Sequence, residues 1–185
     1  YGKIKRRGQP SGADNDGKAA RAAMHTRPAP AVTSSAPAKP QPTGPDYLLV
    51  DGYNVIFAWD ELRKMAETNL DAARRRLMDI LCNYAGYKRC VPILVFDAYK
   101  VRGGTREVEK HHNLYVVYTQ EAETADMYIE RTTHELAKDH RTRVVSSDGA
   151  EQIIVLGNGA LRVSARAFAE EVAAVEKEIR EFLQD

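Results

Sequence analysis

Short apolar runs alternate with longer amphipathic stretches along this chain, starting just after Asp46. The runs are rich in Val, Ile and Leu and carry little charge, which is typical of buried strands. They are YLLVD (47–51), VPILVFDAY (91–99), LYVVYT (114–119), TRVVSSD (142–148) and EQIIVLG (151–157). In the longer stretches, apolar residues recur every three or four positions, which predicts helices over residues 69–87, 123–139 and 164–184.

The alternation of predicted strands and helices indicates the fold class. Strands that are joined through helices form βαβ crossovers, and these produce a largely parallel sheet with helices on both faces. We therefore expect residues 46–185 to form one α/β domain. The chain shows no internal repeat.

Residues 1–45 lack this alternation. From residue 8 to residue 45 the composition is dominated by Ala, Pro, Gly, Ser and Thr, and such a segment cannot bury enough apolar surface to offset its ordering entropy. We expect a flexible tether. Residues 1–46 carry eight basic and three acidic residues, a net charge of +5, whereas residues 47–185 carry 19 and 23, a net charge of −4. The basic tether serves either solubility or contact with nucleic acid or the ribosome.

The composition also bears on the cellular location. Two cysteines, Cys82 and Cys90, are too few for a disulfide framework. No apolar run approaches the ~18 residues that span a bilayer, and the N-terminal stretch has no apolar signal-peptide core. We predict a cytoplasmic protein without a membrane partner. Because the chain begins with Tyr1 rather than Met, we expect it to be part of a longer polypeptide.

Three of the predicted strands end in an aspartate. Asp51 follows LLV, Asp97 follows ILVF and Asp148 follows VVSS. The carboxyl ends of parallel strands share one edge of a sheet, which is where ligands bind in open α/β folds. A single such Asp usually caps a helix or a turn. Three carboxylates at one edge repel one another unless a divalent cation lies among them, and hard oxygen ligands favour Mg²⁺ or Mn²⁺ over zinc.

The start of the helix predicted over residues 123–139 adds a fourth carboxylate, Asp126. Apolar residues follow Asp126, which indicates a helix packed on the sheet with its first turn at the shared edge. Glu123 lies three residues earlier, so we place it on the same face of the first turn, where it either complements the helix dipole or supports the site. Thr124 is a candidate cap for that turn.

A basic stretch between the second and third predicted strands is a candidate for RNA binding. Residues 99–113 are interpreted as a loop beside the acidic edge, in which cations follow phosphates while an aromatic ring stacks on a base. The candidates are Tyr99, Lys100, Arg102, Arg106 and Lys110. An ordinary solvated loop explains the same composition equally well.

Other conspicuous side chains receive a structural interpretation. We place Arg74, Arg75 and Arg76 on the solvated face of their helix. Tyr53 and Trp59 are assigned to the core in preference to stacking on a substrate.

Four short motifs resemble one family of nucleases. LLVDGYNVI, VFDAY, ETADMYIE and SSDGAEQ, in this order and spacing, resemble the YacP-like branch of the NYN ribonucleases, members of the PIN-like nuclease group. The resemblance extends from about Tyr47 to the end of the chain. It implies a Rossmann-like PIN/NYN fold and a metal-dependent endoribonuclease. The residues that would hold the Mg²⁺ or Mn²⁺ are Asp51, Asp97, Asp126 and Asp148.

The resemblance also implies roles for neighbouring positions. Asn54 of DGYN matches the family's Asn and would orient a ligand or a substrate phosphate. Ser147, which precedes Asp148, joins Glu123 and Thr124 as a supporting candidate. Met127 stands where family members often carry a polar residue, which puts a further acid or amide after Asp126 in doubt.

The first seven residues resemble a different family. YGKIKRR, followed by a Pro-rich tether and an NYN domain, is similar to the C-terminal end of bacterial translation GTPases of the tetracycline-resistance ribosomal-protection type. YacP-like nucleases are associated with cleavage of mRNA on ribosomes. The two resemblances imply mRNA and the ribosome as partners, and a translation GTPase domain upstream in the same chain.

Two alternatives to a nuclease remain open. The first is a non-catalytic RNA-binding or ribosome-binding module with a PIN-like fold. The second is a Mg²⁺-dependent phosphatase or phosphotransfer domain, although a nucleophilic-aspartate phosphatase needs a second Asp where Tyr53 stands. For the nuclease, metal ions would supply a deprotonated water and neutralise the leaving oxygen, so we expect products with a 5′ phosphate and a 3′ hydroxyl.

Overall fold

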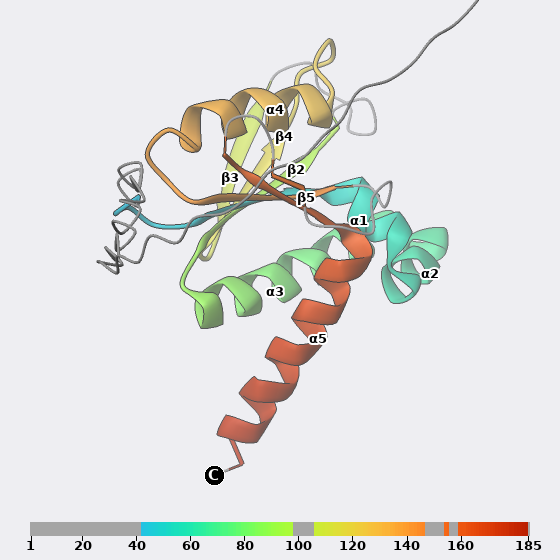
Figure 1. Ribbon diagram of the computed structural model, residues 1–185. Helices are drawn as coiled ribbons and strands as arrows, with labels where there is room; N and C mark the ends of the chain where they lie inside the picture. The colour runs from blue at the N-terminus through green and yellow to red at the C-terminus, as the bar shows by residue number, and fades with distance from the viewer. Residues whose placement is uncertain (1–41, 98–105, 147–153, 156–158, 185) are drawn as a thin grey trace, which may run out of the picture. The chain divides into compact units, whose positions relative to one another are not determined.

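A seven-stranded sheet forms the centre of the domain (Figure 1). The structure, a computed structural model, describes residues 42–97, 106–146, 154–155 and 159–184. The strand order is β3-β4-β2-β1-β5-β7-β6; the five inner strands are parallel, and β3 and β6 pair antiparallel at the two edges. The strands are β1 (Tyr47–Asp51), β2 (Val91–Phe96), β3 (Glu107–His111), β4 (Leu114–Tyr118), β5 (Thr142–Ser146), β6 (Ile154–Val155) and β7 (Leu161–Ser164).

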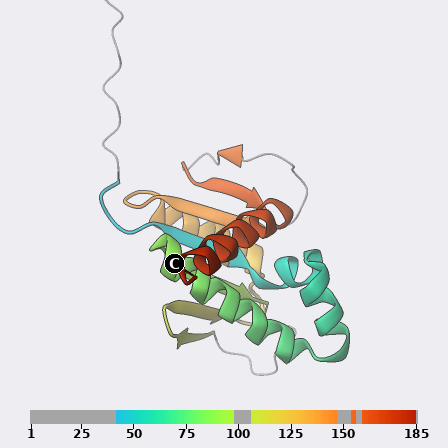
Figure 2. The same cartoon turned by 90° about the horizontal axis from the view of Figure 1, so that it is seen from below.

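Helices cover both faces of this sheet. One face carries α4, and the opposite face carries α3 and α5, as Figures 1 and 2 show from two directions. The helices are α1 (Gly52–Ala58), α2 (Asp60–Thr68), α3 (Leu70–Lys88), α4 (Ala125–Leu136) and α5 (Ala165–Phe182). The α/β fold with a mostly parallel, doubly covered sheet is confirmed.

The core consists of one apolar cluster on each face of the sheet. Successive residues of a strand point to opposite faces, so Leu48 and Val50 of β1 join the cluster beneath α3 and α5, while Leu49 joins the cluster beneath α4. All three are buried. Because β1 is covered on both faces and flanked by β2 and β5, its last residue, Asp51, has a fixed position at the carboxyl edge.

Side-chain caps set where several helices begin. Asn69 accepts a hydrogen bond from the Ala72 N–H at 3.0 Å at the start of α3. Ser164 does the same for the Ala167 N–H at 3.1 Å at the start of α5. These contacts satisfy amide groups that have no partner inside the helix.

The edges of the sheet differ from the sequence expectation. Residues 99–113 are predicted as one loop, but residues 107–111 form β3, which extends the sheet beyond β4. The strand expected over 151–157 is described only at Ile154–Val155, and β7 lies between it and β5. The reason that β3 is missed is physical: a solvent-exposed edge strand needs no continuous apolar run, so its sequence EVEKH carries little strand signal.

None of the helices within the described ranges combines the length and the apolar character that a bilayer crossing requires.

Candidate active site

Three of the four predicted aspartates lie at the carboxyl edge of the sheet. Asp51 is the last residue of β1, and Asp97 directly follows β2, which pairs in parallel with β1. Asp126 is the second residue of α4, whose first turn lies at the same edge. Asp51 lies close enough to Asp97 and Asp126 for both charges to raise its pKa. Ser147 and Asp148 come just after β5 and lie outside the described residues.

Asp51 is a buried carboxylate held by one neighbour. Its side chain accepts hydrogen bonds from the Asn54 N–H at 3.3 Å and from Asn54 Nδ2 at 2.8 Å. The pKa of Asp51 is raised to about 6. Burial is the main cause, the charges of Asp126 and Asp97 add to it, and the hydrogen bonds from Asn54 oppose it. No Lys or Arg in the part of the chain that the structure describes forms an ion pair with Asp51.

Gly52 allows this arrangement because α1 starts directly beside β2. A Cβ atom at residue 52 would lie 2.3 Å from the ring of Phe96, so the close approach requires glycine. Asp51 thereby becomes the cap of α1, and Asn54 of the first turn faces it.

Asp97 fixes the start of α4. Its Oδ1 accepts a hydrogen bond from the Ala125 N–H at 2.6 Å, which ties the first turn of α4 to the end of β2. Thr124 caps the same turn by accepting from the Met127 N–H at 3.2 Å, as predicted. The capping role that is common for a single aspartate is therefore real for Asp51 and Asp97. Asp126 remains exposed beside them.

The carboxylate oxygens at this edge are ligand atoms that suit a hard divalent cation. Carboxylate oxygens are the preferred ligands of Mg²⁺ and Mn²⁺, and the buried charge of Asp51 has two negative neighbours. Within the described ranges, no three His, Cys, Asp or Glu side chains lie close enough together to hold a metal ion. A complete ligand set would therefore need a contribution from beyond those ranges, where Asp148 lies.

Glu123 holds two arginines instead of complementing the first turn of α4. The helix begins at Ala125, so the predicted place of Glu123 within the first turn is wrong. Its buried carboxylate forms ion pairs at 2.5 Å with Arg106, next to β3, and with Arg131 of α4. Burial alone would raise the pKa of Glu123, but the two guanidinium groups outweigh it and lower the pKa. Glu123 links the sheet edge to the helix.

The RNA-binding candidates are separated along the sheet. Tyr99, Lys100 and Arg102 lie outside the described residues. Arg106 adjoins Glu107, which pairs with Tyr118 at the carboxyl edge. Lys110 pairs with Tyr115, three residues further along the strand and toward the opposite edge, and its Nζ lies 5.4 Å from the Tyr115 ring. At about 3.3 Å per residue, this places Lys110 roughly 10 Å away from the edge along β3.

Arg74 is a cation near this site that the sequence interpretation missed. The prediction that it lies on a solvated face is wrong: its side chain is only 14% exposed and donates from Nε to the Tyr53 hydroxyl at 3.1 Å. Its guanidinium also lies over the rings of Tyr53 and Phe96. The sequence does contain a sign of this burial. Arg74 lies four residues from both Leu70 and Met78, on the apolar stripe of α3.

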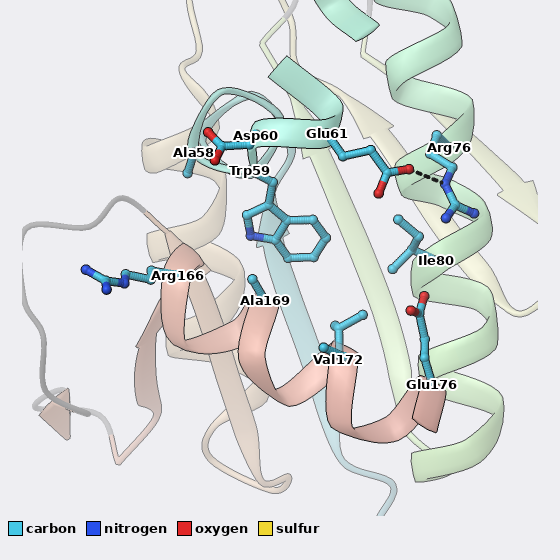
Figure 3. A pocket seen from close by; sticks show the side chains of 11 residues that line it. Ala58, Trp59, Asp60, Glu61, Arg76, Ile80, Arg166, Ala169, Val172 and Glu176 are labelled. Atoms are coloured by element: carbon cyan, nitrogen blue, oxygen red, sulfur yellow. Dashed lines mark hydrogen bonds and ion pairs between the residues drawn. The ribbon is translucent and has the colours of Figure 1, made fainter. Parts of the chain in front are cut away.

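Trp59 belongs to a different surface. Its indole Nε1 donates to the Ala165 carbonyl at 2.7 Å, and its ring lines a hollow of about 550 Å³ with Ile80 and Val172. Figure 3 shows this hollow between three parts of the chain: the junction of α1 and α2, helix α3 and helix α5. The ion pair of Glu61 and Arg76 lies at its margin. Asp51, Asp97 and Asp126 do not line it. Tyr53 is buried in the core, as predicted.

Comparison with known proteins assigns this architecture to a family. Residues 48–185 match the family model described as the YacP-like NYN domain. YacP of Bacillus subtilis is 38% identical over 135 residues, which cover 72% of this chain and 79% of YacP.

Solved structures give the same result. The crystal structure of Rae1 (YacP) from Bacillus subtilis superposes with a TM-score of 0.63 at 37% identity, covering 75% of this chain and 80% of that one. A point mutant of the same protein gives a TM-score of 0.62 at 36% identity, with 74% and 80% coverage.

Proposed function

This chain belongs to the YacP-like NYN family of PIN-like nuclease domains, and from this premise we propose that it is a metal-dependent endoribonuclease. The proposed substrate is RNA, cleaved at internal phosphodiester bonds to leave a 5′ phosphate and a 3′ hydroxyl. The proposed ligands of a Mg²⁺ or Mn²⁺ ion are Asp51, Asp97, Asp126 and Asp148.

The observation that carries this proposal is the environment of Asp51. The Asp51 carboxylate is only 6% exposed and lies beside two other carboxylates, which is unfavourable on electrostatic grounds. Such an arrangement is retained where a cation compensates it. The family relationship and this uncompensated charge support the same chemistry independently.

Each described residue has a defined part in the proposed reaction. Asn54 orients the Asp51 carboxylate by donating to both of its oxygens. Asp97 positions Asp126 because it holds the first amide of α4. The partial positive charge at the start of α4 favours the phosphate of the substrate. A bound divalent ion would lower the pKa of a water molecule and offset charge on the phosphate.

We further propose mRNA on the ribosome as the setting, in the cytoplasm. The support comes from the sequence: the tether of residues 1–45 is basic, whereas the domain is acidic. Its first residues, YGKIKRR, are similar to the end of ribosomal-protection translation GTPases, and we propose such a domain upstream. An acidic domain that cleaves RNA benefits from a separate basic segment that brings it to its substrate.

The two rival functions receive less support. A nucleophilic-aspartate phosphatase needs an acid at the position of Tyr53, whose ring packs at 4.9 Å from that of Phe96 inside the core. A purely RNA-binding module would keep Asp51 as the cap of α1 but does not need Asp97 and Asp126 as negative neighbours of that buried carboxylate.

The test is cleavage of a translated mRNA in a purified translation system, with the 5′ ends of the products identified. We expect cleavage in the Mg²⁺ that translation requires, and products that carry a 5′ phosphate. Cleavage that leaves a 2′,3′-cyclic phosphate would show chemistry without metal activation of water and would contradict the proposal.

A further inference from the structure

We propose that the groove between α4 and strands β3 and β4 binds single-stranded RNA. This α4–β3 groove has a volume of about 520 Å³. Its principal lining residues are Ile93, Val108, Lys110, Tyr115, Val117 and Tyr128. The inference deepens the proposed endoribonuclease function and rests on it for the direction in which the RNA runs.

The groove exists because the sheet is wider than the helix that covers it. Helix α4 packs on β1, β2 and β5, while β3 extends the sheet on the far side of β4. On this face Val108 is 58% exposed and Tyr115 is 37% exposed. Both side chains line the same groove with Lys110 at its side, and an exposed apolar surface that is bordered by polar residues is typical of a binding groove.

Aromatic rings and cations alternate along the groove. The Lys110 ammonium lies 5.4 Å from the centre of the Tyr115 ring. The Tyr128 ring has two guanidinium neighbours, Arg106 at 5.4 Å and Arg131 at 5.6 Å. Proteins bind single strands with this combination, because the rings stack on bases while the cations lie along the phosphates.

The charge of the groove favours a polyanion over an apolar peptide. Lys110 lines the groove, and Arg106 and Arg131 lie beside its Tyr128, where the buried Glu123 that pairs with both arginines offsets one of their charges. These four residues together carry a charge of +2 on a domain whose residues 47–185 carry a net −4. A cationic strip on an acidic domain is selective for a negatively charged strand.

The groove runs along the sheet and approaches the proposed catalytic edge at Val117 and Tyr128. Its Tyr128 lies one turn along α4 from Ala125, whose amide is bound by Asp97. Its other end reaches Tyr47 and Val91, the first residues of β1 and β2. An RNA strand with its scissile phosphate at Asp51 and Asp126 would therefore continue over Arg106 and Tyr128 toward Tyr115.

The test measures binding of a fluorescein-labelled oligouridylate of ten nucleotides to the full chain by fluorescence anisotropy, in chelator so that no cleavage occurs. Tyr115→Leu keeps an apolar side chain but removes the ring, and we expect a loss of affinity of about fivefold or more. Lys110→Gln should weaken binding and lower the slope of log K against log salt by about one.

Matched controls lie on the opposite face of the sheet. Tyr87 of α3 is 45% exposed and Lys64 of α2 is exposed, so Tyr87→Leu and Lys64→Gln make the same chemical changes away from the groove. Both should bind the oligonucleotide as the parent does. Melting temperatures of all four variants establish that each is folded.

Affinities of the groove variants equal to those of the controls would overturn the inference, and so would a parent chain that does not bind the oligonucleotide. Loss of ribosome binding with unchanged oligonucleotide binding would assign the groove to contact with the ribosome instead of a single RNA strand and would also overturn it. Failure of the catalytic proposal gives a different result from failure of the groove proposal. If binding depends on Tyr115 but no RNA is cleaved, the nuclease function is refuted while the groove remains an RNA-binding site.

Discussion

Asn54 donates a hydrogen bond to each carboxylate oxygen of Asp51, from its backbone N–H to Oδ1 at 3.3 Å and from Nδ2 to Oδ2 at 2.8 Å. The two residues are three positions apart in the sequence. They face each other because α1 begins immediately after β1, so Asp51 caps the first turn of α1 and Asn54 lies in that turn. A carboxylate held at both oxygens has one orientation, and that orientation is what a metal ligand requires. Asn54 is therefore a positioning residue for Asp51.

The first prediction concerns this amide. Asn54→Ala removes the side-chain hydrogen bond that lowers the pKa of Asp51, so the pKa should rise further above its usual range. Because a metal binds the deprotonated carboxylate, we expect weaker Mn²⁺ binding and an acidic limb of the pH–activity profile that is shifted to higher pH. Calorimetric titration with Mn²⁺ between pH 5.5 and 8 measures the effect.

Asn69→Ala is the matched control. Asn69 caps α3 by accepting from the Ala72 N–H, so its replacement leaves the two hydrogen bonds of Asp51 intact. Its loss should cost about 1 kcal/mol of stability and leave the pH dependence of Mn²⁺ binding unchanged. Identical pH dependence in Asn54→Ala and Asn69→Ala would show that Asn54 does not position Asp51.

The second prediction concerns stability without metal. Asp51 has a pKa of about 6 in the folded chain against 3.8 for an unperturbed aspartate, so the folded state binds a proton that the unfolded state has released between these values. Stability must therefore fall as the pH rises from about 4 to 6, and the loss is complete above the folded pKa. A shift of this size corresponds to about 2–3 kcal/mol.

Asp51→Asn removes this titration. Urea unfolding in chelator should show the parent losing stability relative to Asp51→Asn between pH 4 and pH 7, with the variant at least as stable as the parent at neutral pH. Parallel stability curves for the two chains would mean that Asp51 is not under electrostatic strain.

The third prediction concerns the two arginines around Glu123. Glu123→Gln should lower the free energy of unfolding by about 1–2 kcal/mol at pH 7, because Arg106 and Arg131 lose a buried charged partner. The pKa of Glu123 is held below 4.5, so this stabilisation is present above that pH and is lost as the pH falls through the lowered value. Urea unfolding at pH 7 and pH 3.5 measures both statements.

Glu181→Gln serves as the comparison for Glu123→Gln. Glu181 pairs with Lys177 at 3.7 Å on the exposed surface of α5. Such a pair contributes less than about 1 kcal/mol. Equal effects of the two substitutions would show that the contacts of Glu123 carry no particular stability.

The sequence predicts the inner sheet and the helices beside it well. Strands β1 and β2 are buried on both faces, so they must be continuous apolar runs. Strands β4 and β5 are buried over most of their length, and α3, α4 and α5 each bury one stripe. The same logic places Asp51 and Asp97 at one edge, because parallel neighbours end together. These features follow from local pattern alone.

The parts that the sequence does not predict depend on contacts between distant segments. Helix α1 contains Val55 and Ile56, which favour strands, and it is helical because Asp51 caps it and it packs against β2. The charged stretch EVEKH becomes β3 only because β4 offers it an open edge. Likewise, the partners of Glu123 and Arg74 come from other elements, so their roles cannot be derived from neighbouring residues.

The fourth prediction separates the tether from the domain. A chain that begins at Asp46 retains all the strands and helices that the structure describes, so it should unfold cooperatively with a melting temperature within a few degrees of the parent. Any loss should appear in affinity for ribosomes or RNA, because residues 1–46 carry a net charge of +5. A non-cooperative transition in the shortened chain would refute the proposed division at residues 45 and 46.

The central claim is that the carboxylates at this edge perform the cleavage. Asp51→Asn and Asp126→Asn keep nearly the same shape and remove one negative charge each. Asp139→Asn makes the same change at an exposed position beyond the end of α4 and serves as the control. All three variants should be folded and should bind RNA.

The direct measurement is the rate at which each variant cleaves a translated mRNA with ribosomes and Mg²⁺ present. We predict a loss of about a hundredfold or more in Asp51→Asn and Asp126→Asn, the size expected when a charged group that acts in the transition state is removed, and a parental rate in Asp139→Asn. Cleavage at the parental rate in both Asp51→Asn and Asp126→Asn would contradict the assignment of the active site to this edge.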